Sequence, residues 1–208
     1  MDRAMYNRGY DAILLTGGSA RRLGGKDKPA LDVGGVPLAA RVAKAAAGAH
    51  RLIVVGPAPD GFVPDVLTRE EPAGGGPVAA LAAGITQVSA DFVAVLAGDL
   101  PFLTAGVVDR LHAAVAALDV ALLVDDDGRD QLLCAVWRTG VLRSVLAGRS
   151  GGSVRALLAA VPPERVERLA ATRSADPPPW FDCDTEEDLA SARNWTAREK
   201  TAREKGSA

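Results

Sequence analysis

The residues best suited to chemistry lie in a glycine-rich, basic segment between Gly17 and Lys28. Glycines at positions 17, 18, 24 and 25 allow tight turns and a close approach of the backbone to a ligand. Backbone N–H groups in such a loop can point inward and bind phosphate oxygens. The segment therefore predicts a phosphate site, in which the charge of a triphosphate would be neutralised by four cations: Arg21, Arg22, Lys26 and Lys28.

Two other phosphate-binding loops do not match this segment. The dinucleotide pattern G-x-G-x-x-G is absent, because Gly18 follows Gly17 directly. The Walker pattern also fails, because Lys26 is followed by Asp27 rather than by serine or threonine. A dinucleotide-dependent dehydrogenase is therefore the least favoured interpretation.

Carboxylates in two later segments indicate a magnesium site. Asp99 follows the apolar run Phe92–Ala97, and a carboxylate at the end of a buried strand can hold Mg²⁺ that substrate phosphates complete. Asp182 and Asp184 alternate along an expected strand over Trp180–Asp184, so we expect them on one face. We expect Asp184 to complete the metal site together with Asp99. Asp182 and Asp184 could also orient an acceptor. The alternative is that these aspartates only form turns or precede a helix cap.

Two further segments offer contacts for a base and for an acceptor. Glu71 is a suitable partner for the N1–H and N2–H₂ donors of guanine, and the backbone at Gly76 and Pro77 would shape the base slot. Arg149, Ser153 and Arg155 lie in a glycine-punctuated loop that could receive an acceptor phosphate. The alternative for that loop is an ordinary solvated connection.

The elements that must position these residues alternate between strands and helices. Several expected strands are continuously apolar, which favours a mostly parallel sheet covered on both faces. Ligands of such sheets sit beyond the carboxyl ends of the strands, so the loops after Thr16, Val55, Arg69 and Ala97 should share one crevice. We expect strands at 10–16, 51–56, 65–69, 92–97, 120–124, 131–138 and 165–170, and helices at 37–48, 78–87, 104–117, 139–147, 154–160 and from 185 onward.

Length, charge and cysteine content narrow the function classes. The chain of 208 residues fits one domain, expected over 1–195, and the repeat of Thr-Ala-Arg-Glu-Lys marks 196–208 as a charged tail. A net charge of −2 argues against general nucleic-acid binding. Neither a signal peptide nor an apolar run of about 18 residues is present, so we expect no membrane association. Only two cysteines occur, Cys134 and Cys183, and a cytoplasmic location is expected.

Together these motifs resemble the molybdenum cofactor guanylyltransferases, over roughly residues 10–195. The resemblance implies a Rossmann-like three-layer α/β/α sandwich of the nucleotide-diphospho-sugar transferase type. It implies that GTP and a molybdopterin-type acceptor are the substrates, Mg²⁺ the cofactor and a transient protein partner the recipient of the product. On the family pattern Leu15, Thr16 and Gly17 hold the nucleotide through their backbone, with Gly18 beside them. The remaining roles implied are phosphate contact by Lys28 and Arg22, base contact by Glu71, and Mg²⁺ binding by Asp99.

The sequence departs from the family pattern at several positions. Thr16 stands where alanine is usual, and Glu71 where aspartate is common. The segment Asp182–Glu186 replaces the usual Asn-Val-Asn-Thr-Pro. Two alternatives therefore stay open: a related nucleotidyltransferase that uses CTP or acts on a sugar phosphate or phospholactate, and a non-catalytic nucleotide-binding module on the same fold.

Overall fold

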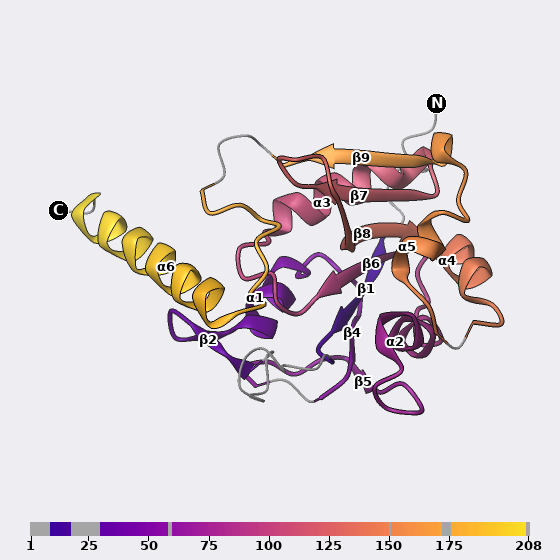
Figure 1. Ribbon diagram of the computed structural model, residues 1–208, viewed down its shortest axis with the longest axis horizontal. Coiled ribbons are helices and arrows are strands. Elements are labelled where there is room, and N and C mark those ends of the chain that lie inside the picture. The colour runs from indigo at the N-terminus through magenta and orange to yellow at the C-terminus, as the bar shows by residue number, and fades with distance from the viewer. Residues whose placement is uncertain (1–8, 18–29, 58–59, 150, 172–175, 207–208) are drawn as a thin grey trace.

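The chain forms one central sheet with helices on both of its faces (Figure 1). The strands follow the order β5-β4-β1-β6-β8-β7-β9, and β8 runs antiparallel to both of its neighbours while the other pairs are parallel. The expected mostly parallel three-layer α/β fold is confirmed. The computed structural model describes residues 9–17, 30–57, 60–149, 151–171 and 176–206.

The strands and helices match most of the expected positions within a few residues. The strands of the sheet are β1 Tyr10–Leu15, β4 Leu52–Val55, β5 Val66–Thr68, β6 Phe92–Ala97, β7 Val120–Val124, β8 Asp130–Arg138 and β9 Val166–Ala170. The helices are α1 Leu38–Ala45, α2 Gly76–Ile85, α3 Ala105–Ala114, α4 Thr139–Leu146, α5 Val154–Leu158 and α6 Glu186–Gly206, with 3₁₀ turns η4 Val115–Ala117 and η5 Pro163–Arg165.

Buried side chains form a separate apolar layer on each face of the sheet. On β1, Ala12 and Leu14 pack toward α1 and α3, whereas Ile13 and Leu15 pack toward α2 and α4. All six residues of β1 are buried, which explains why its sequence is continuously apolar except for Asp11. Because both faces of the central strands are covered, only the ends of the strands remain open to a ligand.

A small hairpin and the long C-terminal helix lie against one side of this sandwich. The hairpin pairs β2 Asp32–Val33 with β3 Val36–Pro37, and sequence patterns did not predict it. Pro37 therefore precedes α1 as its N-cap instead of occupying the first helical position. Val33 and Leu38 share a third apolar cluster with Leu189 and Ala192 of α6, which fastens the helix to the hairpin.

Polar caps fix the starts of two helices. The Val107 amide lies 3.4 Å from the Thr104 hydroxyl, which caps α3. At α6 the Asp188 amide donates to the Thr185 hydroxyl at 3.1 Å, and the Thr185 amide donates to the Asp188 carboxylate at 2.8 Å. From this cap α6 continues without a break across the expected boundary at 195/196 and projects from the body of the molecule (Figure 1).

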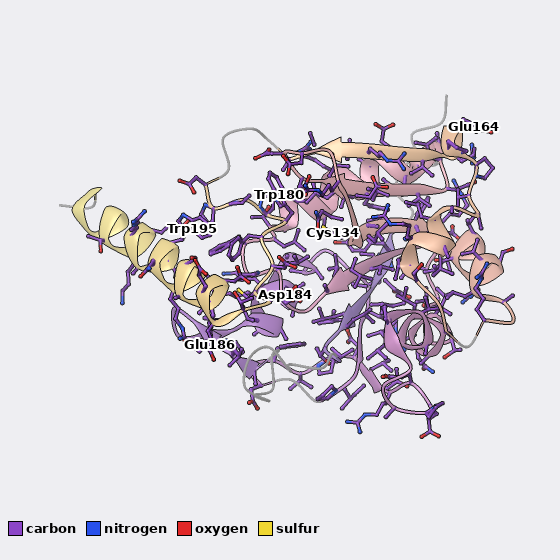
Figure 2. All side chains as sticks on the ribbon, viewed as in Figure 1. Cys134, Glu164, Trp180, Asp184, Glu186 and Trp195 are labelled. Carbon is purple, nitrogen blue, oxygen red and sulfur yellow. The ribbon has the colours of Figure 1, made fainter. Side chains whose placement is uncertain are left out.

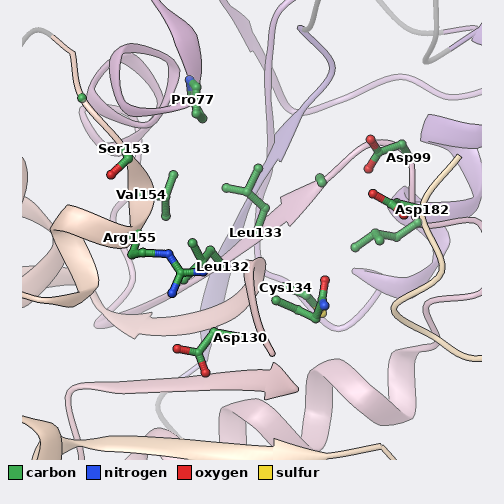
Figure 3. Close-up of a pocket in the computed structure, with 14 residues that line it drawn as sticks. Pro77, Asp99, Asp130, Leu132, Leu133, Cys134, Ser153, Val154, Arg155 and Asp182 are labelled. Carbon is green, nitrogen blue, oxygen red and sulfur yellow. The ribbon is translucent and has the colours of Figure 1, made fainter. Parts of the chain in front are cut away.

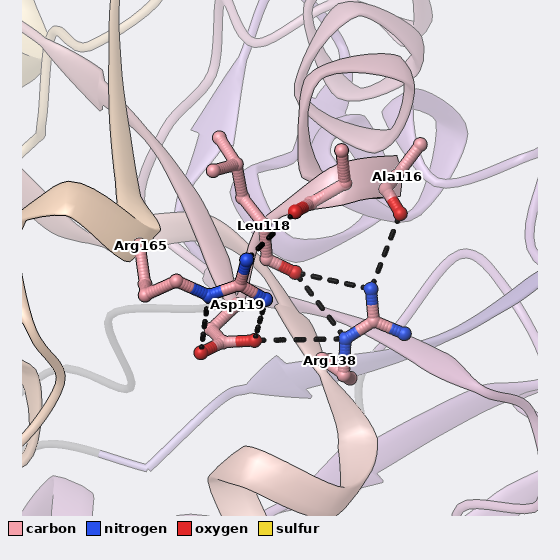
Figure 4. A network of polar contacts seen from close by, with 6 residues as sticks. Ala116, Leu118, Asp119, Arg138 and Arg165 are labelled. Atoms are coloured by element: carbon pink, nitrogen blue, oxygen red, sulfur yellow. Dashed lines mark hydrogen bonds and ion pairs between the residues drawn. The ribbon is translucent and has the colours of Figure 1, made fainter.

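An ion-pair network lies at the end of the sheet opposite the expected crevice, where the parallel strands begin (Figure 4). Arg165 donates to both carboxylate oxygens of Asp119, at 2.8 and 3.0 Å, and Arg138 lies 3.6 Å from the same group. Arg138 also donates to the carbonyl of Ala116 at 3.1 Å. These contacts join the starts of β7 and β9 to the end of β8.

No helix in the described part of the chain is long and apolar enough to cross a membrane.

Candidate active site

Four loops at the carboxyl edge of the sheet enclose a cavity of about 810 Å³. They are the loops that follow β1, β4, β5 and β6, so the sequence prediction that these loops share one crevice is confirmed. Its lining includes five residues that the sequence analysis expected at a nucleotide: Leu15, Thr16, Gly17, Gly76 and Pro77. The rest of the lining is Gly56, Pro57, Arg69, Glu70, Ala73, Gly74, Ala80, Ala97, Gly98, Asp99 and Leu133.

Backbone hydrogen bonds hold the ends of these strands in register at the cavity. The Thr16 amide donates to Val55 and the Gly98 amide donates to Leu15, each at 3.0 Å. A side chain on Gly98 would place its Cβ 2.9 Å from the Leu15 carbonyl oxygen, which is closer than real Cβ atoms approach. Glycine at 98 therefore lets β1 and β6 meet directly beneath Asp99.

On the base side, Glu70 lines the cavity and Glu71 is not among the residues that line it. The half-buried Glu70 accepts a hydrogen bond from the Gly74 amide at 3.0 Å, which closes the loop after β5 and orients the carboxylate. Glu71 is exposed. The role implied for Glu71 is untested, and Glu70 offers the same carboxylate chemistry inside the cavity.

A second cavity of about 540 Å³ adjoins the first (Figure 3). Both cavities share Pro77, Ala97, Asp99 and Leu133, so they form two halves of one cleft with Asp99 at the junction. The second half is lined by both apolar and polar side chains. Its other lining residues are Leu100, Asp130, Gln131, Leu132, Cys134, Gly152, Ser153, Val154, Arg155 and Asp182.

Contrary to the sequence prediction, Asp182 and Asp184 do not lie together on one face of a strand. Residues 181–184 form no strand, and the Cys183 amide donates to the Asp99 carbonyl at 3.1 Å. This bond brings Asp182 to the wall that carries Asp99 (Figure 3). Asp184 instead lies just before α6, and its amide donates to the Asp188 carboxylate in the first turn of that helix at 3.1 Å (Figure 2). Asp184 is exposed and is not among the lining residues of either half of the cleft.

On the opposite wall, Arg155 reaches into the second cavity from α5 (Figure 3). Ser153 caps that helix by accepting from the Ala156 amide at 3.2 Å. Arg149 is exposed and is not among the residues lining either cavity. Of the three residues named in the loop that could receive an acceptor phosphate, the structure thus brings Ser153 and Arg155 to the cleft.

The basic part of the glycine-rich segment lies outside the described residues. Gly18, Arg22 and Lys28 belong to it, and their roles remain predictions.

The carboxylates at the junction suit a hard divalent cation. Asp99 and Asp182 supply oxygen ligands, and Mg²⁺ is held in proteins by one or two carboxylates together with phosphates and water. In the described part of the chain, no group of three or more His, Cys, Asp and Glu side chains could hold a metal.

Cys134 and Cys183 are buried free thiols. Burial raises the pKa of Cys134 to about 12, so the thiol stays protonated near neutral pH although it lies at the floor of the second cavity. A protonated thiol is a poor nucleophile, which argues against covalent catalysis through Cys134.

Sequence patterns missed the contribution of β8 to the cleft. The residues from Asp130 to Cys134 line the second cavity, although the sequence assigns no site role to the strand expected at 131–138. The reason is that β8 runs antiparallel to β6, which puts the start of β8 where the parallel strands end.

Solved structures with this fold include nucleotidyltransferases. The 2-C-methyl-D-erythritol 4-phosphate cytidylyltransferase of Thermus thermophilus superposes with a TM-score of 0.64 at 21% identity, covering 88% of this chain and 96% of that one. The molybdopterin-guanine dinucleotide biosynthesis protein A of Archaeoglobus fulgidus has a TM-score of 0.69 at 17% identity, with 90% and 99% covered. The chain therefore shares its fold with these two proteins.

Sequence comparison places the chain in the nucleotidyltransferase class. The family model of the MobA-like NTP transferase domain matches residues 12–170, and the chain belongs to this family. The molybdenum cofactor guanylyltransferase of Rhodobacter capsulatus is 30% identical over 194 residues, which cover 88% of this chain and 94% of that protein. The chain is therefore a nucleotidyltransferase.

Proposed function

We propose that the protein transfers GMP from GTP to the terminal phosphate of molybdopterin and releases pyrophosphate. The observation that carries this proposal is the two-part cleft with Asp99 at the junction of its halves. A transfer between two substrates needs two adjoining sites and a charged group where they meet, because the reacting phosphates must be held in line.

The larger cavity suits the nucleotide. Its walls are backbone-rich at Gly17, Gly56 and Gly76, which lets a ligand approach the main chain closely. Glu70 presents an oriented carboxylate that matches the adjacent N1–H and N2–H₂ donors of guanine. Lys28 and Arg22 would bind the phosphates from the glycine-rich segment.

The smaller cavity suits the acceptor. Leu132, Leu133 and Val154 offer an apolar surface to a flat ring, and Arg155 offers a guanidinium group to a phosphate. Arg149 and Asp184, also expected at the acceptor, do not line this cavity. Asp182 lies where the acceptor half meets Asp99.

We propose that Asp99 and Asp182 would hold Mg²⁺, which replaces the earlier pairing of Asp99 with Asp184. The donor set fits, since both groups are carboxylates that line the same cavity. When bound, the ion would supply positive charge that screens the repulsion between the two phosphates.

In the reaction, an oxygen of the acceptor phosphate bonds to the α-phosphorus of GTP as the bond from that phosphorus to the β-phosphate oxygen breaks. The electron pair of the broken bond leaves with pyrophosphate. A phosphate monoester is mostly ionised at neutral pH, so the acceptor needs no general base. The protein instead positions both substrates and stabilises charge, with Lys28 near the leaving group.

The test is to incubate the purified protein and Mg²⁺ with molybdopterin and each of GTP, CTP, ATP and UTP. Pyrophosphate release and the mass of the product are measured. We expect a guanine dinucleotide from GTP and little product from the others. Faster turnover of CTP would show that the protein prefers cytosine. Tight GTP binding without any pyrophosphate release would favour a non-catalytic nucleotide-binding module.

We place this reaction in the cytosol, since the two thiols of the chain are unpaired.

A further inference from the structure

We propose that the side-chain hydroxyl of Thr16 is a positioning group that fastens the turn after β4 to the end of β1 and so shapes the nucleotide half of the cleft. The effect on nucleotide binding rests on the proposed function, whereas the hydrogen bond of the Thr16 hydroxyl is a feature of the fold.

The hydroxyl of Thr16 makes the contact between these two elements. Its Oγ1 lies 2.9 Å from the Pro57 carbonyl oxygen and 3.4 Å from that of Val55. The Thr16 amide donates to the same Val55 carbonyl at 3.0 Å. One residue thus holds both the last residue of β4 and the turn beyond it.

The turn needs such a tether because its backbone lies directly against the end of β1. Gly56 has a φ of +129°, a value that side chains disfavour, and a Cβ there would lie 2.5 Å from the Gly17 nitrogen and 2.7 Å from Thr16 Oγ1. On its other side the Gly56 amide donates to the Thr68 carbonyl at 3.0 Å. The turn is therefore held between β1 and β5.

Thr16 lines the cavity, but its hydroxyl points to the carbonyls of Val55 and Pro57, so we assign it to positioning rather than to direct binding. Thr16 is 1% exposed, and Gly17, Gly56 and Pro57 lie around it on the wall of the cavity. Without the hydroxyl, the Pro57 carbonyl would lose a buried donor and the turn would be free to shift. A shift of this wall would move the backbone that faces the nucleotide.

The test compares the wild-type protein with Thr16→Val, which keeps the shape but lacks the hydroxyl, and Thr16→Ser, which keeps the hydroxyl. Hydrogen exchange of the Gly56 amide and binding of GTP with Mg²⁺ are measured on the full chain. We expect Thr16→Val to speed that exchange and weaken GTP binding, each by about tenfold, the scale of one hydrogen bond. Exchange of the Leu14 amide, inside β1, should stay unchanged.

Recovery by Thr16→Ser would assign both effects to the hydroxyl. Equal losses in Thr16→Val and Thr16→Ser would overturn the proposal, because a variant that keeps the hydroxyl would then lose as much as one that lacks it. Faster exchange at Gly56 with unchanged GTP binding would overturn it as well. A wild-type protein that binds no nucleotide would refute the proposed function, while the exchange data would still decide whether the hydroxyl fixes the turn.

Discussion

The amide of Cys183 donates a hydrogen bond to the carbonyl of Asp99 at 3.1 Å, across a separation of 84 residues in the chain. This contact joins the segment before α6 to the turn after β6. It places Asp182 beside the junction of the cleft and leaves Asp184 at the start of the helix. The two late aspartates should therefore differ in their effect on catalysis.

Replacing the carboxylates one at a time tests this difference. We expect Asp99→Asn to lower kcat by about 10³ or more, because charge stabilisation at the reacting phosphates is lost. Asp182→Asn should lower kcat about 10²-fold and raise the Mg²⁺ concentration that gives half-maximal rate. Asp184→Asn should change kcat by less than about threefold. A larger loss in Asp184→Asn than in Asp182→Asn would contradict the proposed metal site.

The neighbouring glutamates provide a matched pair for base recognition. Glu70→Gln should raise the KM for GTP by about tenfold, since the amide cannot accept from both guanine donors. It should raise the KM for ITP less, because hypoxanthine lacks the N2 amino group. Glu71→Gln, a change outside the cavity lining, is the control and should leave both values unchanged. The opposite pattern would return base recognition to Glu71.

Lys28 tests the role predicted for the glycine-rich segment. We expect Lys28→Ala to lower kcat by about 10²–10³, the effect of losing one group that stabilises charge in the transition state. Steady-state kinetics with GTP and molybdopterin would measure the change, and Lys44→Ala, at an exposed position of α1, is the control. Unchanged kcat in Lys28→Ala would remove the lysine from the mechanism.

The sequence predicted the layers of the fold well because buried parallel strands leave a plain apolar pattern. The positions of the site residues were harder to predict where they depend on the direction of a strand or on the shape of a loop. Glu70 and Glu71 are adjacent and chemically alike, and the Gly74 amide selects which one is oriented at the cavity. Asp130 reaches the cleft only because β8 runs antiparallel, which no local pattern reveals. Asp182 is placed by a long-range bond from Cys183.

The ion-pair network of Asp119, Arg138 and Arg165 predicts that the free energy of unfolding depends on pH. Hydrogen bonds from Arg165 hold the pKa of Asp119 below its usual value of 3.8. A lowered pKa means that Asp119 stabilises the fold above about pH 4 and that this contribution is lost as the pH falls through the lowered value. Asp119→Asn should therefore destabilise the protein near pH 7.

Urea unfolding from pH 7 downward would measure this effect. The difference in unfolding free energy between the wild-type protein and Asp119→Asn should shrink once the pH falls below about 4. Asp126→Asn, in the exposed loop after β7, is the control and should show a much smaller difference at pH 7. A difference for Asp119→Asn that does not change with pH would show that the ionised carboxylate is not responsible.

The central claim is that the two halves of the cleft bind the two substrates and meet at Asp99. A crystal structure with a non-hydrolysable GTP analogue and Mg²⁺ tests it most directly. We expect guanine beside Glu70, the α-phosphate within reach of Asp99, and the smaller cavity left open for the acceptor. An analogue bound in the smaller cavity, or one whose α-phosphate lies far from Asp99, would refute the proposed division of the cleft.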